Sequence, residues 1–232
     1  MIKPRVKICC ISSVAEANLA IKYGASALGL VSEMPSGPGV IALEAIAEIA
    51  EKAPPPIGTF LLTCKQTTDE IAAQHKICRT NTIQICDNFL DSYDDLRKAL
   101  PPVKIVQVVH VDGAESLREA VEISEKVDAI LLDSGNQKLE IKELGGTGRT
   151  HDWQISRRIV EAVKKPVFLA GGLKAENVFE AVAKVQPFGL DLCSSVRRDG
   201  KLDEDKLKRF FAELDGFNAT AQRQKDARLS RK

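Results

Sequence analysis

Short apolar runs alternate with amphipathic segments along almost the whole chain. The apolar runs are rich in Val, Ile and Leu and are bounded by glycine, proline or polar clusters, which is typical of strands buried in a parallel sheet. On this pattern we predict strands at residues Val6–Ile11, Ala27–Val31, Ile57–Leu62, Thr82–Cys86, Val103–Val109, Ala129–Leu132, Pro166–Ala170 and Phe188–Leu192.

The segments between these strands carry apolar residues at helical spacing, and several of them stop at a glycine or at consecutive prolines. Strict alternation of strand and helix indicates an α/β fold with a parallel sheet, and the number of repeats favours a single closed (β/α)8 TIM barrel. An open doubly wound sheet is the alternative, although no G-x-G-x-x-G motif follows the first strand. The predicted helices are Val14–Tyr23, Leu43–Lys52, Thr67–Lys76, Tyr93–Leu100, Ala114–Lys126, Trp153–Lys164, Ala175–Lys184 and Glu204–Leu214.

Length and charge narrow this picture. The 232 residues fit one barrel domain, because α/β barrels run at about 200–250 residues. We place the barrel at residues 1–215 and expect the polar, basic segment 216–232 to be a disordered tail. Lys and Arg number 33 against 32 Asp and Glu, so the charge balance gives no indication of nucleic-acid binding.

The sequence shows no pattern typical of a membrane span, a signal peptide or a cysteine metal site. No apolar run of about 18 residues predicts a membrane span, and the N-terminus lacks the apolar core of a signal peptide. We therefore expect a cytoplasmic protein without a membrane partner. The six cysteines contain no C-x-x-C pair and no His at metal-ligand spacing from any of them, so we expect reduced thiols, no metal and no cofactor.

Candidate chemistry follows the strands, because the active site of such a barrel lies on the loops after the strands. The first strand leads into Cys9 and Cys10. Side chains alternate along a strand, and we place Lys7 and Cys9 inward, since a lysine facing outward would have to pass among the packed helices. Cys10 is then expected on the opposite face. Taken alone, Cys9 is either a buried core thiol or a reactive group.

The sixth and later strands are followed by acidic, glycine-rich and serine-rich segments. Asp133 at the end of the sixth strand is either a cap or an acid catalyst. Glycines let backbone N–H groups approach an anion closely, and the loops after strands seven and eight commonly form the phosphate site of this fold. The candidate substrate and phosphate ligands are Lys7, Gly146, Thr147, Gly148, Gly171, Gly172, Asp191, Cys193, Ser194 and Ser195.

These motifs together resemble the phosphoribosylanthranilate isomerase family of tryptophan biosynthesis over roughly residues 5–214. The resemblance rests on Lys7-Ile8-Cys9, on Leu131-Leu132-Asp133-Ser134 with the glycine-rich segment after it, and on Ala170-Gly171-Gly172-Leu173. It implies an Amadori rearrangement of a phosphorylated sugar, with Cys9 as general base and Asp133 as general acid. It implies no cofactor, and it leaves open whether the protein is a monomer or a homodimer.

Some positions depart from the family pattern. Cys10 replaces a glycine, and Gly39 stands where the family has an arginine that binds the substrate. Cys86 replaces a histidine, and Cys193 replaces a serine. We expect weak binding of the anthranilate carboxylate unless another cation has replaced the arginine, and we expect Gly39→Arg to improve kcat/KM. The candidates for a replacement cation are Arg149, Arg197 and Arg198.

Three functions therefore stay open at this point. The first is an active phosphoribosylanthranilate isomerase. The second is a related barrel enzyme that acts on a different phosphorylated sugar, which the missing arginine favours. The third is a non-catalytic barrel that binds a phosphorylated ligand or a partner protein, which the presence of both Cys9 and Asp133 argues against.

Overall fold

The predicted parallel sheet closes into a barrel. The structure is a computed structural model that describes residues 3–135, 141–145 and 148–229, with side chains through residue 216. Each strand pairs in parallel with the next, and the eighth pairs with the first, which confirms the single (β/α)8 barrel. The barrel strands are β1 (Arg5–Ile8), β2 (Ala27–Val31), β3 (Gly58–Thr63), β4 (Thr82–Ile85), β5 (Lys104–His110), β6 (Ala129–Asp133), β7 (Val167–Leu169) and β8 (Gly189–Leu192).

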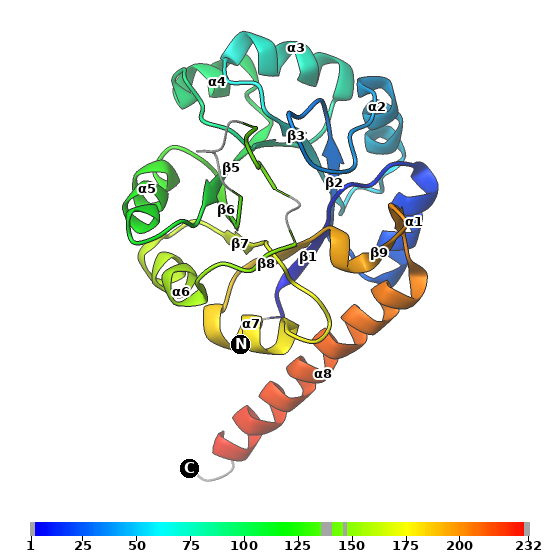
Figure 1. Cartoon of the computed structure of the whole chain (residues 1–232), viewed down its shortest axis with the longest axis vertical. Coiled ribbons are helices and arrows are strands. Elements are labelled where there is room, and N and C mark those ends of the chain that lie inside the picture. The colour runs from blue at the N-terminus through cyan, green and yellow to red at the C-terminus, as the bar shows by residue number, and fades with distance from the viewer. Residues whose placement is uncertain (1–2, 136–140, 146–147, 230–232) are drawn as a thin grey trace.

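The helices surround the strands, as Figure 1 shows. Local signals set their ends: the Ser13 hydroxyl accepts the N–H of Glu16 at the start of α1, and Gly24 closes the same helix in a left-handed conformation. Within the described part of the chain, no helix is long and apolar enough to cross a membrane. The helices are α1 (Val14–Tyr23), α2 (Leu43–Lys52), α3 (Thr68–Cys78), α4 (Tyr93–Ala99), α5 (Glu115–Ser124), α6 (Trp153–Ala162), α7 (Val178–Val185) and α8 (Glu204–Leu229), with a short 3₁₀ turn η1 (Ser194–Val196) and a hairpin of β9 (Arg197–Arg198) and β10 (Lys201–Leu202) before α8.

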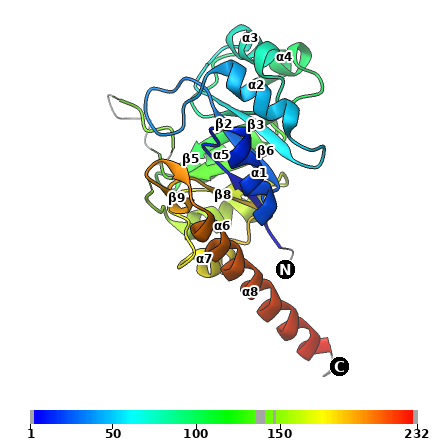
Figure 2. The same cartoon turned by 90° about the vertical axis from the view of Figure 1, so that its right-hand side faces the viewer.

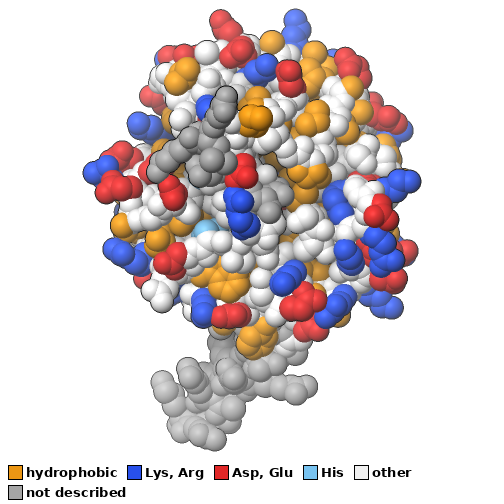
Figure 3. Space-filling view, in the orientation of Figure 1, with side chains coloured by type: hydrophobic (Ala, Val, Ile, Leu, Met, Phe, Trp, Pro, Cys, Tyr) orange, Lys and Arg blue, Asp and Glu red, His pale blue; other side chains and the backbone are white. Residues whose placement is uncertain are grey.

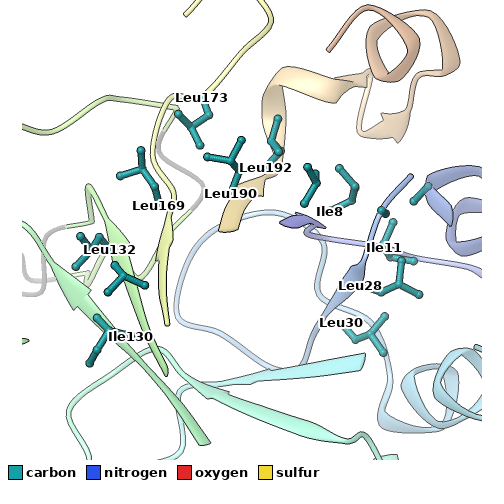
Figure 4. Close-up of a cluster of buried hydrophobic side chains, with 14 of the residues drawn as sticks. Ile8, Ile11, Leu28, Leu30, Ile130, Leu132, Leu169, Leu173, Leu190 and Leu192 are labelled. Carbon is teal, nitrogen blue, oxygen red and sulfur yellow. The ribbon is translucent and has the colours of Figure 1, made fainter. Parts of the chain in front are cut away.

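The strands bury both of their faces, which explains their continuous apolar runs. One face carries residues such as Ile8, Leu28 and Leu190, which belong to the core cluster that includes buried residues of the surrounding helices (Figure 4). The other face points into the barrel and carries smaller or aromatic residues, among them Ala27 and Phe60. Because side chains alternate along each strand, one face packs against the helices and the other fills the barrel interior. The active site of such a barrel lies where the strands end.

Several predicted boundaries differ from the observed ones, and two of these differences matter here. The first strand ends at Ile8 instead of Ile11, because Cys10 has a φ of +61° and turns the chain out of the strand. The last helix continues to Leu229 instead of ending at Leu214, so the segment expected to be disordered is helical as far as the structure describes it. Residues 219–229 are rich in Ala, Gln, Lys and Arg, which favour helix. Figure 2 shows this helix projecting beyond the barrel.

Candidate active site

One pocket opens where the strands end, and it gathers residues from the loops after β1, β2, β4, β6, β7 and β8. Of the residues expected to form the site, Gly146 and Thr147 lie outside the described part of the chain. Lys7 is described but does not line the pocket. The predicted residues that do line it are Cys9, Asp133, Gly148, Gly171, Gly172, Asp191, Cys193, Ser194 and Ser195.

The pocket also contains residues that the sequence analysis did not select. Met34, Pro38, Leu62 and Leu144 give it an apolar side, and Gln84 adds an amide. No sequence signal distinguishes these apolar residues, because the same residue types are common in ordinary cores and loops. Gln84 alone could have been found, because it faces inward on a strand in which the residues on either side face the helices.

Lys7 and Asp191 form a buried ion pair at the inner face of adjacent strands. The Lys7 Nζ atom lies 2.8 Å from Oδ2 of Asp191, and it lies over the Phe60 ring. Burial lowers the pKa of Lys7, but the charges of Asp191 and Cys9 outweigh it, so the pKa is raised and the ammonium stays charged. Burial raises the pKa of Asp191 to about 7, while Lys7 acts in the opposite direction.

Cys9 lies beside this pair, and 7% of its surface is exposed. Gly29 on β2 leaves room for it: a Cβ there would lie 3.0 Å from both Cys9 Sγ and Lys7 Nζ. The hydrogen bond from Cys10 lowers the pKa of the Cys9 thiol, as does the charge of Lys7. A hydrogen bond with Cys193 and burial outweigh both, so the pKa of Cys9 is raised. The lysine alone therefore does not make Cys9 a thiolate at neutral pH.

Cys10 is placed differently from the expectation. It lines the pocket instead of facing the helices, because its left-handed backbone conformation turns the side chain back toward the opening. Its sulfur contacts Cys193, at 2.8 Å between the Sγ atoms. Cys10 is therefore part of the site and does not serve as a neutral control for substitutions at Cys9.

Gly39 lies against Cys10. A Cβ added at Gly39 would be 2.4 Å from Cys10 Cβ and 2.9 Å from its Sγ, and the φ of Gly39 is +84°. Real side chains do not approach so closely, so any residue larger than glycine collides with Cys10. The lack of space for a side chain therefore argues against the expectation that Gly39→Arg alone improves kcat/KM, which stays a prediction.

Asp133 ends β6 and is buried at the pocket wall, with 8% exposed. Its Oδ1 accepts the backbone N–H of Ser134 at 2.7 Å. Burial raises the pKa of Asp133 to about 6, and the charges of Asp191 and Cys9 add to this. The Ser134 N–H and His110 act in the opposite direction. A carboxyl group in this range exchanges a proton readily near neutral pH.

The loops after β6, β7 and β8 meet at one end of the pocket. Gly171 and Gly172 have φ values of +81° and +62°, and a Cβ at Gly172 would be 2.8 Å from the backbone of Thr150. A Cβ at Gly148 would lie 3.6 Å from the Ser194 hydroxyl. The Ser195 hydroxyl is buried, without a hydrogen-bond partner among the described residues. Bare backbone and a buried unsatisfied hydroxyl together suit an anion.

None of the three candidate cations lines the pocket. Arg149 pairs with Glu143. Arg197 is buried and binds Glu16 and the carbonyl oxygens of Cys9 and Cys10. Arg198 is exposed and pairs with Asp203. In the described part of the chain, the pocket lining contains neither lysine nor arginine.

Two contacts of Lys142 connect the loop after β6 to the loops after β4 and β2. Lys142 Nζ lies 2.7 Å from Oδ2 of Asp87 after β4, and the carbonyl of Lys142 accepts the Ser36 hydroxyl after β2 at 2.6 Å.

Basic and acidic side chains are mixed over the face shown in Figure 3, with no large area of one sign. The described residues include no group of His, Cys, Asp and Glu side chains that could hold a metal ion.

Comparisons with known proteins agree with this arrangement. The family model described as N-(5'-phosphoribosyl)anthranilate (PRA) isomerase matches residues 6–213. The N-(5'-phosphoribosyl)anthranilate isomerase of Methanosarcina acetivorans is 34% identical over 227 residues, which cover 92% of this chain and 94% of that protein. That of Haloferax volcanii is 36% identical over 211 residues, covering 90% of this chain and 91% of that protein.

Solved structures give the same result. The phosphoribosylanthranilate isomerase of Thermotoga maritima superposes with a TM-score of 0.77 and 27% identity, covering 92% of this chain and 99% of that one. A phosphoribosylanthranilate isomerase in complex with reduced 1-(o-carboxyphenylamino)-1-deoxyribulose 5-phosphate superposes with a TM-score of 0.74 and 26% identity, with the same coverage. The match spans the whole barrel, and the chain therefore belongs to the N-(5'-phosphoribosyl)anthranilate isomerase family.

Proposed function

We propose that this chain catalyses the Amadori rearrangement of N-(5'-phosphoribosyl)anthranilate, the isomerisation that gives its family its name. The observation that carries the proposal is that Cys9 and Asp133, from strands β1 and β6, line one pocket with the glycine and serine loops after β7 and β8. The expected cytoplasmic location goes with this proposal and stays a prediction, as does the choice between monomer and homodimer.

The proposed reaction needs one acid and one base. Asp133 donates a proton to the ribose ring oxygen, the C1′–O bond breaks, and the anthranilate nitrogen becomes an iminium. Cys9 as the thiolate removes the C2′ proton, which gives an enolamine, and this tautomerises to the ketone. No oxidant is required, because the aldose end is reduced as C2′ is oxidised. The raised pKa of Asp133, at about 6, supports the acid role.

The phosphate is assigned to the loops after β6, β7 and β8. Gly171 and Gly172 offer backbone N–H groups that no Cβ covers, and the buried Ser195 hydroxyl offers a donor. Lys7 is assigned a positioning role, because its buried charge lies beside Cys9, pairs with Asp191 and is outside the pocket lining. Gly146 and Thr147 are kept as proposed ligands from the sequence pattern alone.

One observation favours the alternative of a different phosphorylated sugar. Part of the pocket lining is apolar, with Met34, Pro38 and Leu144, and the described lining provides no cation for a carboxylate. A phosphoribosylated amine with an uncharged substituent would fit that surface equally well. Direct assay separates the two substrates.

The test is complementation of a tryptophan auxotroph that lacks this isomerase, together with an assay on phosphoribosylanthranilate. Wild type should restore growth, and Cys9→Ala and Asp133→Asn should each lower turnover by at least about 10²-fold, the usual scale for positioned acid and base groups. Cys78→Ala serves as the matched control, because this buried thiol lies on α3 outside the pocket. Near-normal turnover of Cys9→Ala would exclude the base role, and no turnover by wild type would favour the different sugar.

A further inference from the structure

Three thiols meet at one wall of the pocket, where the segments after β1 and β8 lie side by side. The Cys10 sulfur lies 2.8 Å from the Cys193 sulfur and 3.8 Å from the Cys9 sulfur. The first contact joins two residues far apart in the sequence, on adjacent strand ends. A pair of thiols this close can be joined by a bond with little movement of either segment.

The surrounding structure holds this pair together. Cys10 occupies the left-handed region, which is unfavourable for a residue with a side chain, and Gly39 leaves the space that its side chain fills. Arg197, in the same segment as Cys193, donates hydrogen bonds to the carbonyl oxygens of Cys9 and Cys10. An ion pair holds this arginine in turn, with Arg197 Nη1 3.1 Å from Oε1 of Glu16. The two thiol-bearing segments are therefore tied to each other through buried groups.

We propose that Cys10 and Cys193 are an oxidisable dithiol, which hydrogen peroxide converts to a disulfide that inhibits the enzyme and which a dithiol reductant restores. The formation of the disulfide is independent of the acid and base roles assigned to Asp133 and Cys9, whereas its inhibitory effect rests on the proposed function. It assigns Cys10 and Cys193 as a modification site, with peroxide as the class of oxidant.

The positions of the two sulfurs assign their roles. Cys193 is half-buried and lines the pocket, so a small oxidant can reach it. Hydrogen bonds from Cys10 and Cys9 hold the pKa of Cys193 below the ordinary thiol range, and the charge of Arg197 adds to this. The hydrogen bond to Cys193 raises the pKa of Cys10. Cys193 is then the thiolate that attacks, and Cys10 is the thiol that resolves.

The oxidation balances in two steps. The Cys193 thiolate attacks one peroxide oxygen, the O–O bond breaks, and the hydroxide that leaves takes up a proton to become water. Cys193 is now a sulfenic acid. The Cys10 sulfur attacks the Cys193 sulfur as its proton is lost, the S–S bond forms, and the S–O bond breaks with release of a second water. Two thiols and one peroxide become one disulfide and two waters.

The disulfide changes the site at the position of the proposed base. Bonded sulfurs lie about 2.0 Å apart, so the two segments draw closer, and the residue after Cys193 is Ser194 of the phosphate loop. Cys10 also stops donating its hydrogen bond to Cys9. A displacement of about 1 Å beside reacting groups can cost roughly 10²-fold in rate. Inhibition therefore follows from the geometry of the cross-link.

The experiment compares the full-length protein before and after brief treatment with hydrogen peroxide, followed by dithiothreitol. Trypsin should give a disulfide-linked pair of peptides, residues 8–22 and 185–197, in non-reducing mass spectrometry. Isomerase activity should fall by roughly 10²-fold and return on reduction. Cys10→Gly, which suits the left-handed backbone, and Cys193→Ser should both lose the link, whereas Cys9→Ala should keep it.

Cys64→Ser is the matched control, because Cys64 is also half-buried and lies outside the pocket. It should retain both the link and the inhibition. A link that persists in Cys10→Gly would overturn the assignment in favour of Cys9, and unlinked Cys193 sulfinic acid would overturn the dithiol. A link without loss of activity would overturn its inhibitory role. Peptide mapping needs no turnover, so it decides the dithiol even for a chain inactive on phosphoribosylanthranilate.

Discussion

The two ends of the pocket are built in different ways. The proposed phosphate end consists mainly of backbone, where Gly171 and Gly172 hold positive φ values and Ser194 and Ser195 supply hydroxyls. The opposite end is formed by the segments after β1 and β2, where Cys10 and Gly39 stand in place of a glycine and an arginine of the family pattern, beside the apolar Met34 and Pro38. Substitutions occur at both ends, because Cys193, next to Ser194, stands where the family pattern has a serine.

This difference has a physical origin. At the proposed phosphate end, a backbone N–H group approaches an anion most closely where glycine leaves the space open, which favours glycine at those positions. A charged or apolar side chain can be supplied from another loop, so the opposite end can change in steps that compensate one another. Cys10 and Gly39 are such a pair, because the side chain of one fills the space beside the other.

The largest expected effect tests this compensation. Gly39→Arg should lower the free energy of unfolding by about 1–3 kcal/mol, the usual cost of overpacking, because its Cβ would lie 2.4 Å from Cys10 Cβ. Cys10→Gly combined with Gly39→Arg should recover at least about half of that loss, since contacting residues couple by 0.5–3 kcal/mol or so. Chemical denaturation of the single and double variants measures the coupling.

Gly113→Arg is the control for the backbone contribution. Gly113 also has a positive φ, of +129°, but nothing lies within 4 Å of an added Cβ. It should cost less than Gly39→Arg, and Cys10→Gly should not change its effect. Strict additivity of Cys10→Gly and Gly39→Arg would show that the two positions are independent.

A smaller effect is expected at the phosphate end. Gly172→Ala should weaken the binding of a phosphorylated substrate analogue by roughly 10-fold, because a Cβ there collides with Thr150 at 2.8 Å and shifts a loop that carries one or two hydrogen bonds of about 1 kcal/mol each. Isothermal titration measures the dissociation constant. Gly200→Ala, also at positive φ but in open space, should leave it unchanged, and equal weakening by both would point to general loss of stability.

The smallest effect concerns pH and the groups between the two ends. In the proposed mechanism, the active form has Asp133 protonated and Cys9 ionised. Because the pKa of Asp133 is raised to about 6 and that of Cys9 is raised above the ordinary thiol value, this form is a minor but constant fraction between the two pKa values. Below about pH 6 the thiolate is lost without a gain in protonated Asp133, so kcat/KM should fall about tenfold per pH unit.

Steady-state kinetics between pH 5 and 9 or so would locate this limb, with unfolding curves at each pH to confirm that the protein stays folded. The limb should have its midpoint near the Asp133 value of about 6. A midpoint near 4, the range of an exposed carboxyl group, would mean that Asp133 is not the acid.

Much of the fold was predictable. The strand and helix periodicities placed each element within a few residues, apart from the end of the last helix, because the runs of the buried strands stay apolar. The two main errors have different causes. Nothing in the residue type of Cys10 indicates a φ of +61°, and the helix past Leu214 follows from propensity that a polar composition concealed.

The sequence by itself determined the barrel, the order of its strands, and the strand ends that carry Cys9, Asp133 and the glycine pairs, because these follow from local periodicity and from the rule that loops after the strands meet. Only the tertiary structure decided which thiol faces which. The contact of Cys10 with Cys193, the space at Gly39 and the burial that raises the pKa of Asp133 join residues far apart along the chain. Such contacts depend on packing between neighbouring strands at the scale of an ångström, which residue type and spacing do not predict.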